Sequence, residues 1–151
     1  MWITKDNIGE FIDGSLMDCS NMDITRLEYI PDGIKRLYCY DNKLTELPKL
    51  PEGLVDLWCY NNKLTELTKL PDGLISLWCE NNQLTELPKL PDGITHLDCS
   101  GNKLTELPKL PNSLTDLYCE DNKLTYEITI DNIKEHNKLL KRKLILKRIC
   151  V

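Results

Sequence analysis

The sequence predicts one solenoid built from stacked, parallel β-strands, and three observations support this fold class. A block of twenty residues recurs without interruption from residue 34 to residue 125. Apolar residues occupy the same places in every copy, as expected where each turn buries its apolar side against the next turn. Paired prolines such as Pro48 and Pro51 recur in most copies and exclude an α-helix from that part of the repeat.

Each copy follows the pattern L-x-x-L-x-C-x-x-N-x-L, and residues 11–33 form a degenerate sixth copy. In that copy the apolar places are taken by Met17, Cys19, Ile24, Leu27 and Ile30. In the others the recurring residues are Leu or Ile at 34, 54, 74, 94 and 114; Leu at 37, 57, 77, 97 and 117; Cys at 39, 59, 79, 99 and 119; Asn at 42, 62, 82, 102 and 122; and Leu at 44, 64, 84, 104 and 124.

The local structure of one turn follows from these residue types. The alternation around Leu37 and Cys39 predicts a short strand that contains the Cys and directs both side chains into the core. Asn42 follows, where its side-chain amide can bond loop backbone groups that would otherwise be buried without partners. The arm over 47–51 is expected to be extended and polyproline-like, and Asp92-Gly93 and its equivalents turn the chain toward the next strand.

The motif "LTELPKLP" in these copies resembles the LPX-type leucine-rich-repeat proteins, a group that includes the YopM and IpaH effectors of bacterial type III secretion. Similar repeats with Cys in the strand occur in proteins of giant DNA viruses. The resemblance covers residues 11–125 and implies a right-handed solenoid of the α/β horseshoe class, whose parallel sheet lies on a concave face that binds proteins. It also implies a viral or bacterial protein that interacts with a host. Some relatives carry a ubiquitin-ligase domain with a catalytic Cys, which nothing in this sequence matches.

The positions that do not repeat predict the functional site. Side chains that flank the inward Leu and Cys of each strand point to the concave face. Aromatic residues cluster in the earlier copies and acids in the later ones, which favours a protein or peptide partner, in particular a basic one. The predicted contact residues are Tyr38, Tyr40, Asp56, Trp58, Tyr60, Trp78, Glu80, Asp98, Tyr118 and Glu120.

Three alternatives stay open for this face. The rings could stack on one another along the ladder and only stabilise the sheet. Exposed aromatic rings also stack on sugars, which would make the protein carbohydrate-binding. The patch could instead join copies of the chain in a structural, self-associating protein, although a monomer is favoured.

Neither the cysteines nor the histidines predict a metal site or a catalytic site. The six strand cysteines form a straight row, which suits a small apolar core residue better than a zinc site whose ligands converge from several directions. His96 lies near Asp98 and Asp116 but in no recognisable pocket with a nucleophile, and His136 belongs to another region. We therefore expect a non-catalytic protein without a metal or cofactor.

The charge is unevenly distributed along the chain. Residues 131–151 contain seven Lys or Arg and two Asp or Glu, so they carry +5, and residues 1–130 carry −10. An acidic solenoid is a poor nucleic-acid binder. No apolar run reaches a membrane-spanning length, and the first residues do not resemble a signal peptide. The protein is therefore expected in the cytoplasm, including that of a host cell.

The repeats divide the chain into an N-terminal cap at 1–16, the solenoid at 17–125 and a C-terminal cap at 126–151, because an open solenoid exposes its core and strand edges. Asp131 is the expected N-cap of a basic helix over 132–148, with Ile133, Leu140 and Leu144 on one face. The run 144–146 leaves a short final strand as an alternative. The basic residues of this cap suit contact with the acidic solenoid, or with acidic lipid or nucleic acid, and Cys150 has no assigned role.

Overall fold

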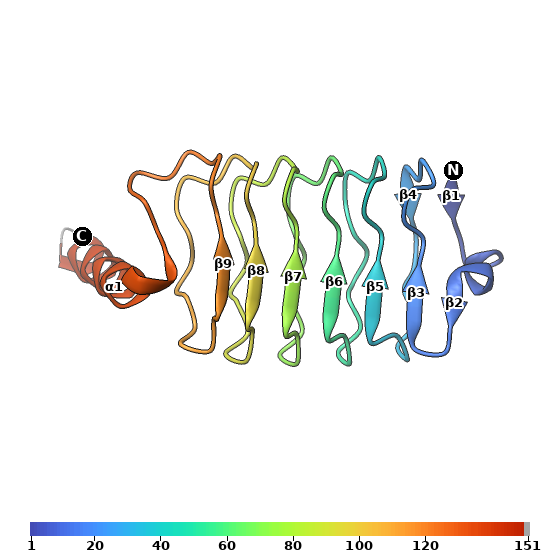
Figure 1. The fold of residues 1–151 in the computed structure, drawn as a ribbon, viewed down its shortest axis with the longest axis horizontal. Helices are drawn as coiled ribbons and strands as arrows, with labels where there is room; N and C mark the ends of the chain where they lie inside the picture. The colour runs from blue at the N-terminus through green and yellow to red at the C-terminus, as the bar shows by residue number, and fades with distance from the viewer. Residues whose placement is uncertain (150–151) are drawn as a thin grey trace.

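The computed structural model describes residues 1–149, and its central feature is a row of short strands, one for each turn of the chain (Figure 1). Six strands of three residues run parallel, and residues twenty positions apart pair across them, as Leu37 does with Leu57. The predicted solenoid with a parallel sheet is therefore confirmed. The six strands are β3 (Leu16–Asp18), β5 (Arg36–Tyr38), β6 (Asp56–Trp58), β7 (Ser76–Trp78), β8 (His96–Asp98) and β9 (Asp116–Tyr118).

The strands end one residue before each Cys, which corrects the expectation that they contain the Cys. The Cys39 N–H still donates to the Trp58 carbonyl at 2.9 Å, so the ladder continues on the donor side. The Cys39 carbonyl, however, accepts hydrogen bonds from the side chains of Asn42 and Asn62 instead of from a neighbouring backbone N–H. The sheet therefore ends where asparagine side chains replace backbone donors.

These asparagines form a buried ladder beneath the strand ends. The Asn62 Oδ1 accepts from the Leu44 N–H at 2.9 Å, and its Nδ2 donates to the carbonyls of Cys39, Cys59 and Tyr60 at 2.9, 3.2 and 3.1 Å. Asn42, Asn82, Asn102 and Asn122 make equivalent bonds. The role predicted for the recurring Asn is confirmed, since each side chain satisfies backbone groups of two successive turns.

The position before each of these asparagines has a left-handed backbone. Its φ angle is 51° to 53° at Asp41, Asn61, Asn81 and Asp121, and 61° at Gly101. Asn, Asp and Gly are the residues that adopt this conformation at least cost. Variation at this position, which lies beside the predicted contact columns, is therefore limited by the backbone. At Gly101 an added Cβ would meet the end of the flexible Asn81 side chain, which would have to move.

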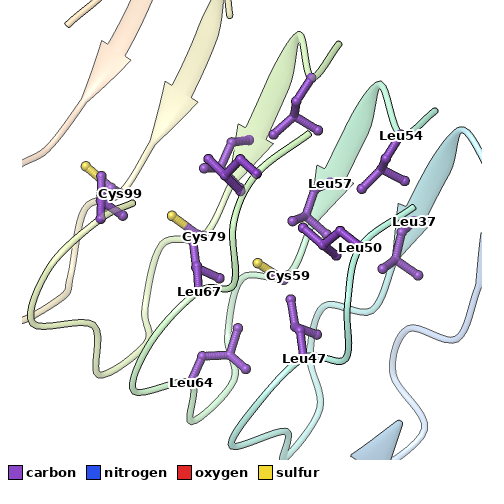
Figure 2. Close-up of a cluster of buried hydrophobic side chains, with 14 of the residues drawn as sticks. Leu37, Leu47, Leu50, Leu54, Leu57, Cys59, Leu64, Leu67, Cys79 and Cys99 are labelled. Atoms are coloured by element: carbon purple, nitrogen blue, oxygen red, sulfur yellow. The ribbon is translucent and has the colours of Figure 1, made fainter. Parts of the chain in front are cut away.

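The core consists of parallel rows of leucine side chains, and the row of cysteines packs in the same cluster (Figure 2). Leu37, Leu57, Leu77 and the cysteines from Cys19 to Cys99 have no exposed surface. Burial raises the pKa of the Cys19 thiol to about 12 and that of Cys119 to about 11, so these side chains are neutral, weakly reactive core residues. Over residues 34–125 the chain forms no helix, and the return arms are extended as the prolines predict.

The N-terminal segment covers the first turn in two ways. Strand β1 (Trp2–Ile3) pairs in parallel with β4 (Arg26–Leu27) in a separate two-stranded sheet. A 3₁₀ turn, η1 (Ile8–Phe11), leads into β2 (Ile12–Asp13), which pairs antiparallel with β3 and covers the first edge of the main sheet. Strand β3 begins at Leu16, the last residue of the predicted N-terminal cap. The division into cap and solenoid stays a prediction.

The C-terminal segment leaves the repeat pattern and forms a helix, as expected. A 3₁₀ turn, η2 (Ile130–Asn132), precedes α1 (Ile133–Ile149), which lies beyond β9 at the far end of the row (Figure 1). Asp131 was the expected N-cap, but it lies inside the 3₁₀ turn. That extra turn moves the cap to Thr129, whose N–H donates to Asn132 Oδ1 at 3.0 Å. The alternative of a final strand over 144–146 is wrong.

Two side chains near the start of α1 attach it to the solenoid. His136 is buried; its Nε2 donates to the Pro108 carbonyl at 3.0 Å, and its Nδ1 lies 2.8 Å from the Tyr126 hydroxyl. Asn137 accepts from the Leu110 N–H at 2.9 Å and donates to the Leu110 carbonyl at 2.8 Å. The sequence pattern did not reveal this clamp, because neither residue is apolar or part of the repeat.

The expected apolar face of α1 is only partly used. Ile133 is buried, Leu140 is half-buried, and Leu144 is 60% exposed. All residues from 141 to 148 are exposed, so the helix leaves the solenoid after its second turn. Within residues 1–149, no helix is long and apolar enough to cross a membrane. Cys150 lies outside the described residues.

Candidate binding surface on the concave face

The strand register assembles the predicted contact residues into columns on the outer side of the sheet, which we call the concave face. Tyr38 pairs with Trp58, Trp58 with Trp78, and the column continues through Asp98 to Tyr118. The inward neighbours Leu37 and Cys39 are fully buried, whereas Tyr38 and Tyr40 are half-buried. This alternation confirms which side chains face outward, while their role in binding stays a prediction.

Five rings form a continuous aromatic stack over strands β5 to β7. Tyr38 stacks on Trp58 with ring centres 4.4 Å apart, and Tyr40 stacks on Tyr60 at 4.5 Å with only 7° between the planes. Trp58 links the two columns, since its centre lies 6.4 Å from that of Tyr40 and 6.2 Å from that of Trp78. The ladder stacking considered from the sequence therefore occurs, and it gives the rings fixed positions.

The two indole N–H groups of the aromatic stack differ in their partners. Trp78 Nε1 donates to Ser76 Oγ at 2.8 Å, and Ser76 is itself buried. Trp58 Nε1 is buried and has no hydrogen-bond partner in the described part of the chain. Asp56 holds the place in β6 that Ser76 holds in β7. Sequence reasoning missed Ser76 as the residue that orients Trp78; the signal was a small hydroxyl residue two positions before the Trp.

Glu80 continues the concave face next to the aromatic stack. Its side chain is half-buried, and its Oε2 is buried without a hydrogen-bond partner among residues 1–149. Burial raises the pKa of Glu80 from its ordinary value of 4.5 to about 7, and the nearby Asp98 and Asp41 carboxylates raise it further against the effect of a backbone hydrogen bond. Burial also raises the pKa of Tyr60, and its neighbours Tyr40, Asp41 and Glu80 raise it further. The site thus contains a carboxyl group that a cation would stabilise in its ionised form.

The remaining predicted residues lie farther along the same face. Asp98 Oδ1 accepts from the Ser100 N–H at 2.9 Å and from its hydroxyl at 2.6 Å, so one of its oxygens is already used within the chain. Tyr118 is 46% exposed and Glu120 is also exposed. In the part of the chain that the structure describes, Tyr118 stacks on no other ring. The structure therefore groups Tyr38, Tyr40, Trp58, Tyr60, Trp78 and Glu80 and sets Tyr118 and Glu120 apart.

The other chemically reactive side chains do not converge here. His96 Nε2 lies 3.2 Å from an oxygen of Asp116 and its Nδ1 lies 2.7 Å from Thr95 Oγ1, all on an exposed surface. Among residues 1–149, no group of three or more His, Cys, Asp or Glu is arranged to hold a metal ion. The concave face is thus a surface of rings and carboxylates, which suits binding by contact.

Comparison with known proteins agrees with this architecture. Residues 93–117 match the model of the family described as Leucine Rich Repeat. The structure is similar to that of a Shigella effector LRR domain, with 33% identity, a TM-score of 0.76, and coverage of 84% of this chain and 57% of that one. No curated protein sequence gives a significant match.

Two structures of YopM from Yersinia are also similar. The leucine-rich effector protein YopM from Yersinia pestis gives 34% identity and a TM-score of 0.72, over 79% of this chain and 34% of that one. YopM from Yersinia enterocolitica gives 32% identity and a TM-score of 0.55, over 71% and 29%. The present chain thus spans between about a third and just over half of these solved chains. The chain folds as a leucine-rich-repeat solenoid, and its repeats are similar to those of bacterial effectors.

Proposed function

We propose that the protein is a non-catalytic protein-interaction module whose concave face docks a basic segment of a partner protein. The main support is that the aromatic stack lies beside Glu80, a half-buried side chain whose Oε2 has no hydrogen-bond partner within residues 1–149. An unsatisfied buried polar atom costs free energy that a ligand can recover by bonding to it. A Lys or Arg of the partner would offset this cost by pairing with the Glu80 carboxylate, whose side chain is only half-buried.

The stacked rings favour this use of the surface. Rings already held by their neighbours lose little conformational freedom when a partner docks, which is why Trp and Tyr are typical binding anchors. A cationic side chain also interacts favourably with an indole or phenol face. Stacking within the sheet and binding of a partner are therefore compatible roles for the same residues.

Selection of a displayed random-peptide library on the intact chain tests the proposal. We expect the selected peptides to be enriched in Lys and Arg. Trp58→Ala combined with Trp78→Ala should lower their affinity by at least about 2 kcal/mol, or roughly thirtyfold. Trp2→Ala is the matched control, because Trp2 is 56% exposed on the separate two-stranded sheet. Unchanged peptide affinity in a double variant that melts far earlier would show that the aromatic stack is only structural.

The pH dependence of binding separates a basic partner from a purely apolar one. Because a cation favours ionised Glu80, whose pKa is raised to about 7, affinity should rise as the pH passes upward through that value. Glu80→Gln should flatten this dependence, and Glu66→Gln, on the opposite exposed arm, should not. A pH-independent affinity would contradict a basic partner at Glu80. Binding to a glycan array that depends on the same tryptophans would favour the carbohydrate alternative instead.

We also propose that the partner is a host protein met in the cytoplasm. The similarity to the repeats of a Shigella effector and of YopM supports this. Proximity labelling by the tagged chain in cultured cells should mark proteins with accessible basic segments. The double Trp variant should no longer mark them, and equal labelling by both forms would contradict the proposal.

A further inference from the structure

The distal half of α1 has an exposed surface that packing against the solenoid does not account for. From residue 138 to residue 148 it contains six Lys or Arg and no Asp or Glu. In the middle of this stretch Leu144, Ile145 and Leu146 are 60%, 47% and 60% exposed. A run of three exposed apolar residues is unfavourable in water unless another surface covers it.

Contact with the solenoid does not account for these residues. The clamp at His136 and Asn137 holds only the first turns of the helix. Beyond it α1 leaves the repeats, and a cleft of about 820 Å³ opens between the helix and the return arms of the last repeats. Its apolar walls include Leu107, Leu140 and Leu144, so even the side of α1 that faces the repeats is partly open.

The basic side chains are also largely available. Lys143 lies 3.2 Å from a Glu106 oxygen, and Lys138 lies 3.9 Å from one of Glu135. Within residues 1–149, the other four basic side chains of this stretch make no ion pair; they are Lys141, Arg142, Lys147 and Arg148. Glu135 belongs to α1 itself, so neutralisation of the acidic solenoid explains one of the six charges, that of Lys143.

We propose that the distal half of α1 binds the surface of an anionic phospholipid membrane. The exposed residues lie on several sides of the helix, since Leu144, Ile145 and Leu146 are consecutive and successive helical residues are about 100° apart. A peptide seated in the cleft would cover Leu140 and Leu144 and leave Ile145 and Leu146 in water. A lipid surface covers all of them, while lysine and arginine side chains extend to the phosphate headgroups.

The charge distribution orients the molecule on such a surface. Residues 1–130 carry −10, so the solenoid is repelled by anionic lipid, whereas residues 131–151 carry +5. The helix lies at one end of the row of strands (Figure 1). Contact through α1 therefore places the protein end-on, with the concave face clear of the membrane and open to a partner. The helix rests on the bilayer rather than crossing it, because it has 17 residues and many charges.

Vesicle flotation with the intact chain tests this proposal. We expect at least tenfold stronger binding to phosphatidylcholine vesicles with about 30 mol % phosphatidylserine than to phosphatidylcholine alone. The variant Lys141→Gln, Arg142→Gln, Lys147→Gln should bind the anionic vesicles at least tenfold more weakly, because each basic residue near the surface contributes about fivefold. The matched control is Lys49→Gln, Lys69→Gln, Lys89→Gln, which removes equal charge from the solenoid and should change binding by less than about twofold.

A second variant tests the apolar contribution. Leu144→Ser, Ile145→Ser, Leu146→Ser keeps every charge and the clamp, so its melting temperature should match the wild type, yet it should bind anionic vesicles at least tenfold more weakly. Equal or absent binding to both vesicle types overturns the proposal. Full retention by the serine variant, with tight binding to duplex RNA or DNA, would show a polyanion site instead. Dimers that dissociate in the serine variant, without vesicle binding, would show that a second copy covers the helix.

Discussion

The interior of the solenoid and its concave face are built from the same strands but follow opposite rules. Inside, each column holds one residue type or a close apolar equivalent, such as Ile34 and Leu54, and the buried asparagine amides find partners in two successive turns. On the concave face, the column from Tyr38 to Tyr118 changes residue type along the sheet, and Trp58 and Glu80 keep buried polar atoms without partners. The difference supports the proposal that the interior determines stability and that the concave face binds a partner.

The largest effect is expected from breaking the interior ladder. Asn82 accepts from the Leu64 N–H at 2.9 Å and donates to the carbonyls of Cys59, Cys79 and Glu80. Asn82→Ala would leave these buried backbone groups without partners, so the free energy of unfolding should fall by about 4 kcal/mol. Urea denaturation measures this. The adjacent Gln83→Ala, which loses one exposed contact with Lys103, should cost less than about 0.5 kcal/mol. Similar losses in both variants would contradict a structural role for the ladder.

A smaller effect, a gain in stability, is expected where one copy departs from the sequence of its neighbours. Thr68 stands where other copies have Pro48, Pro88 and Pro108, and its buried hydroxyl has no hydrogen-bond partner within the residues that the structure describes. Thr68→Pro removes that hydroxyl and restricts the unfolded chain, and the matching backbone of the other copies accommodates a proline. Stability should rise by about 1 kcal/mol, measured as an increase in Tm. A lower Tm would show that the uniformity of the repeats does not predict local stability.

The smallest effect concerns the concave face itself. Burial raises the pKa of Glu80 from 4.5 to about 7, so between these values the folded protein holds a proton that the unfolded chain releases. Stability should therefore decrease as the pH rises through this window, and the penalty is complete above about pH 7. Because the side chain is partly exposed, solvent screening limits the effect to about 1 kcal/mol or less. Glu80→Gln should remove this dependence in melting curves at about pH 5 and pH 8, and a variant that keeps it would contradict the assignment to Glu80.

Most of the fold was predictable from the sequence because its contacts are periodic. The recurrence of Leu, Cys and Asn every twenty residues predicts parallel strands, their register and the outward columns, since each residue meets its own equivalent in the next turn. The same pattern predicted the side of the sheet on which Trp58 and Trp78 lie. The extent of each strand was predicted one residue too long, because the sequence does not show that asparagine side chains replace backbone donors at Cys39 and its equivalents.

The tertiary structure alone decided the features that depend on non-repeating neighbours. The clamp at His136 and Asn137 joins residues 27 or 28 positions apart, and no periodicity predicts such pairs. The unpartnered atoms of Trp58 and Glu80 and the raised pKa of Glu80 arise from burial, which depends on how the side chains of neighbouring strands pack. The sequence by itself thus determined the repeat architecture through local pattern and stacking. Only the folded chain decided where α1 leaves the solenoid and which polar groups of the concave face are buried without a partner among residues 1–149, because both depend on contacts that occur once.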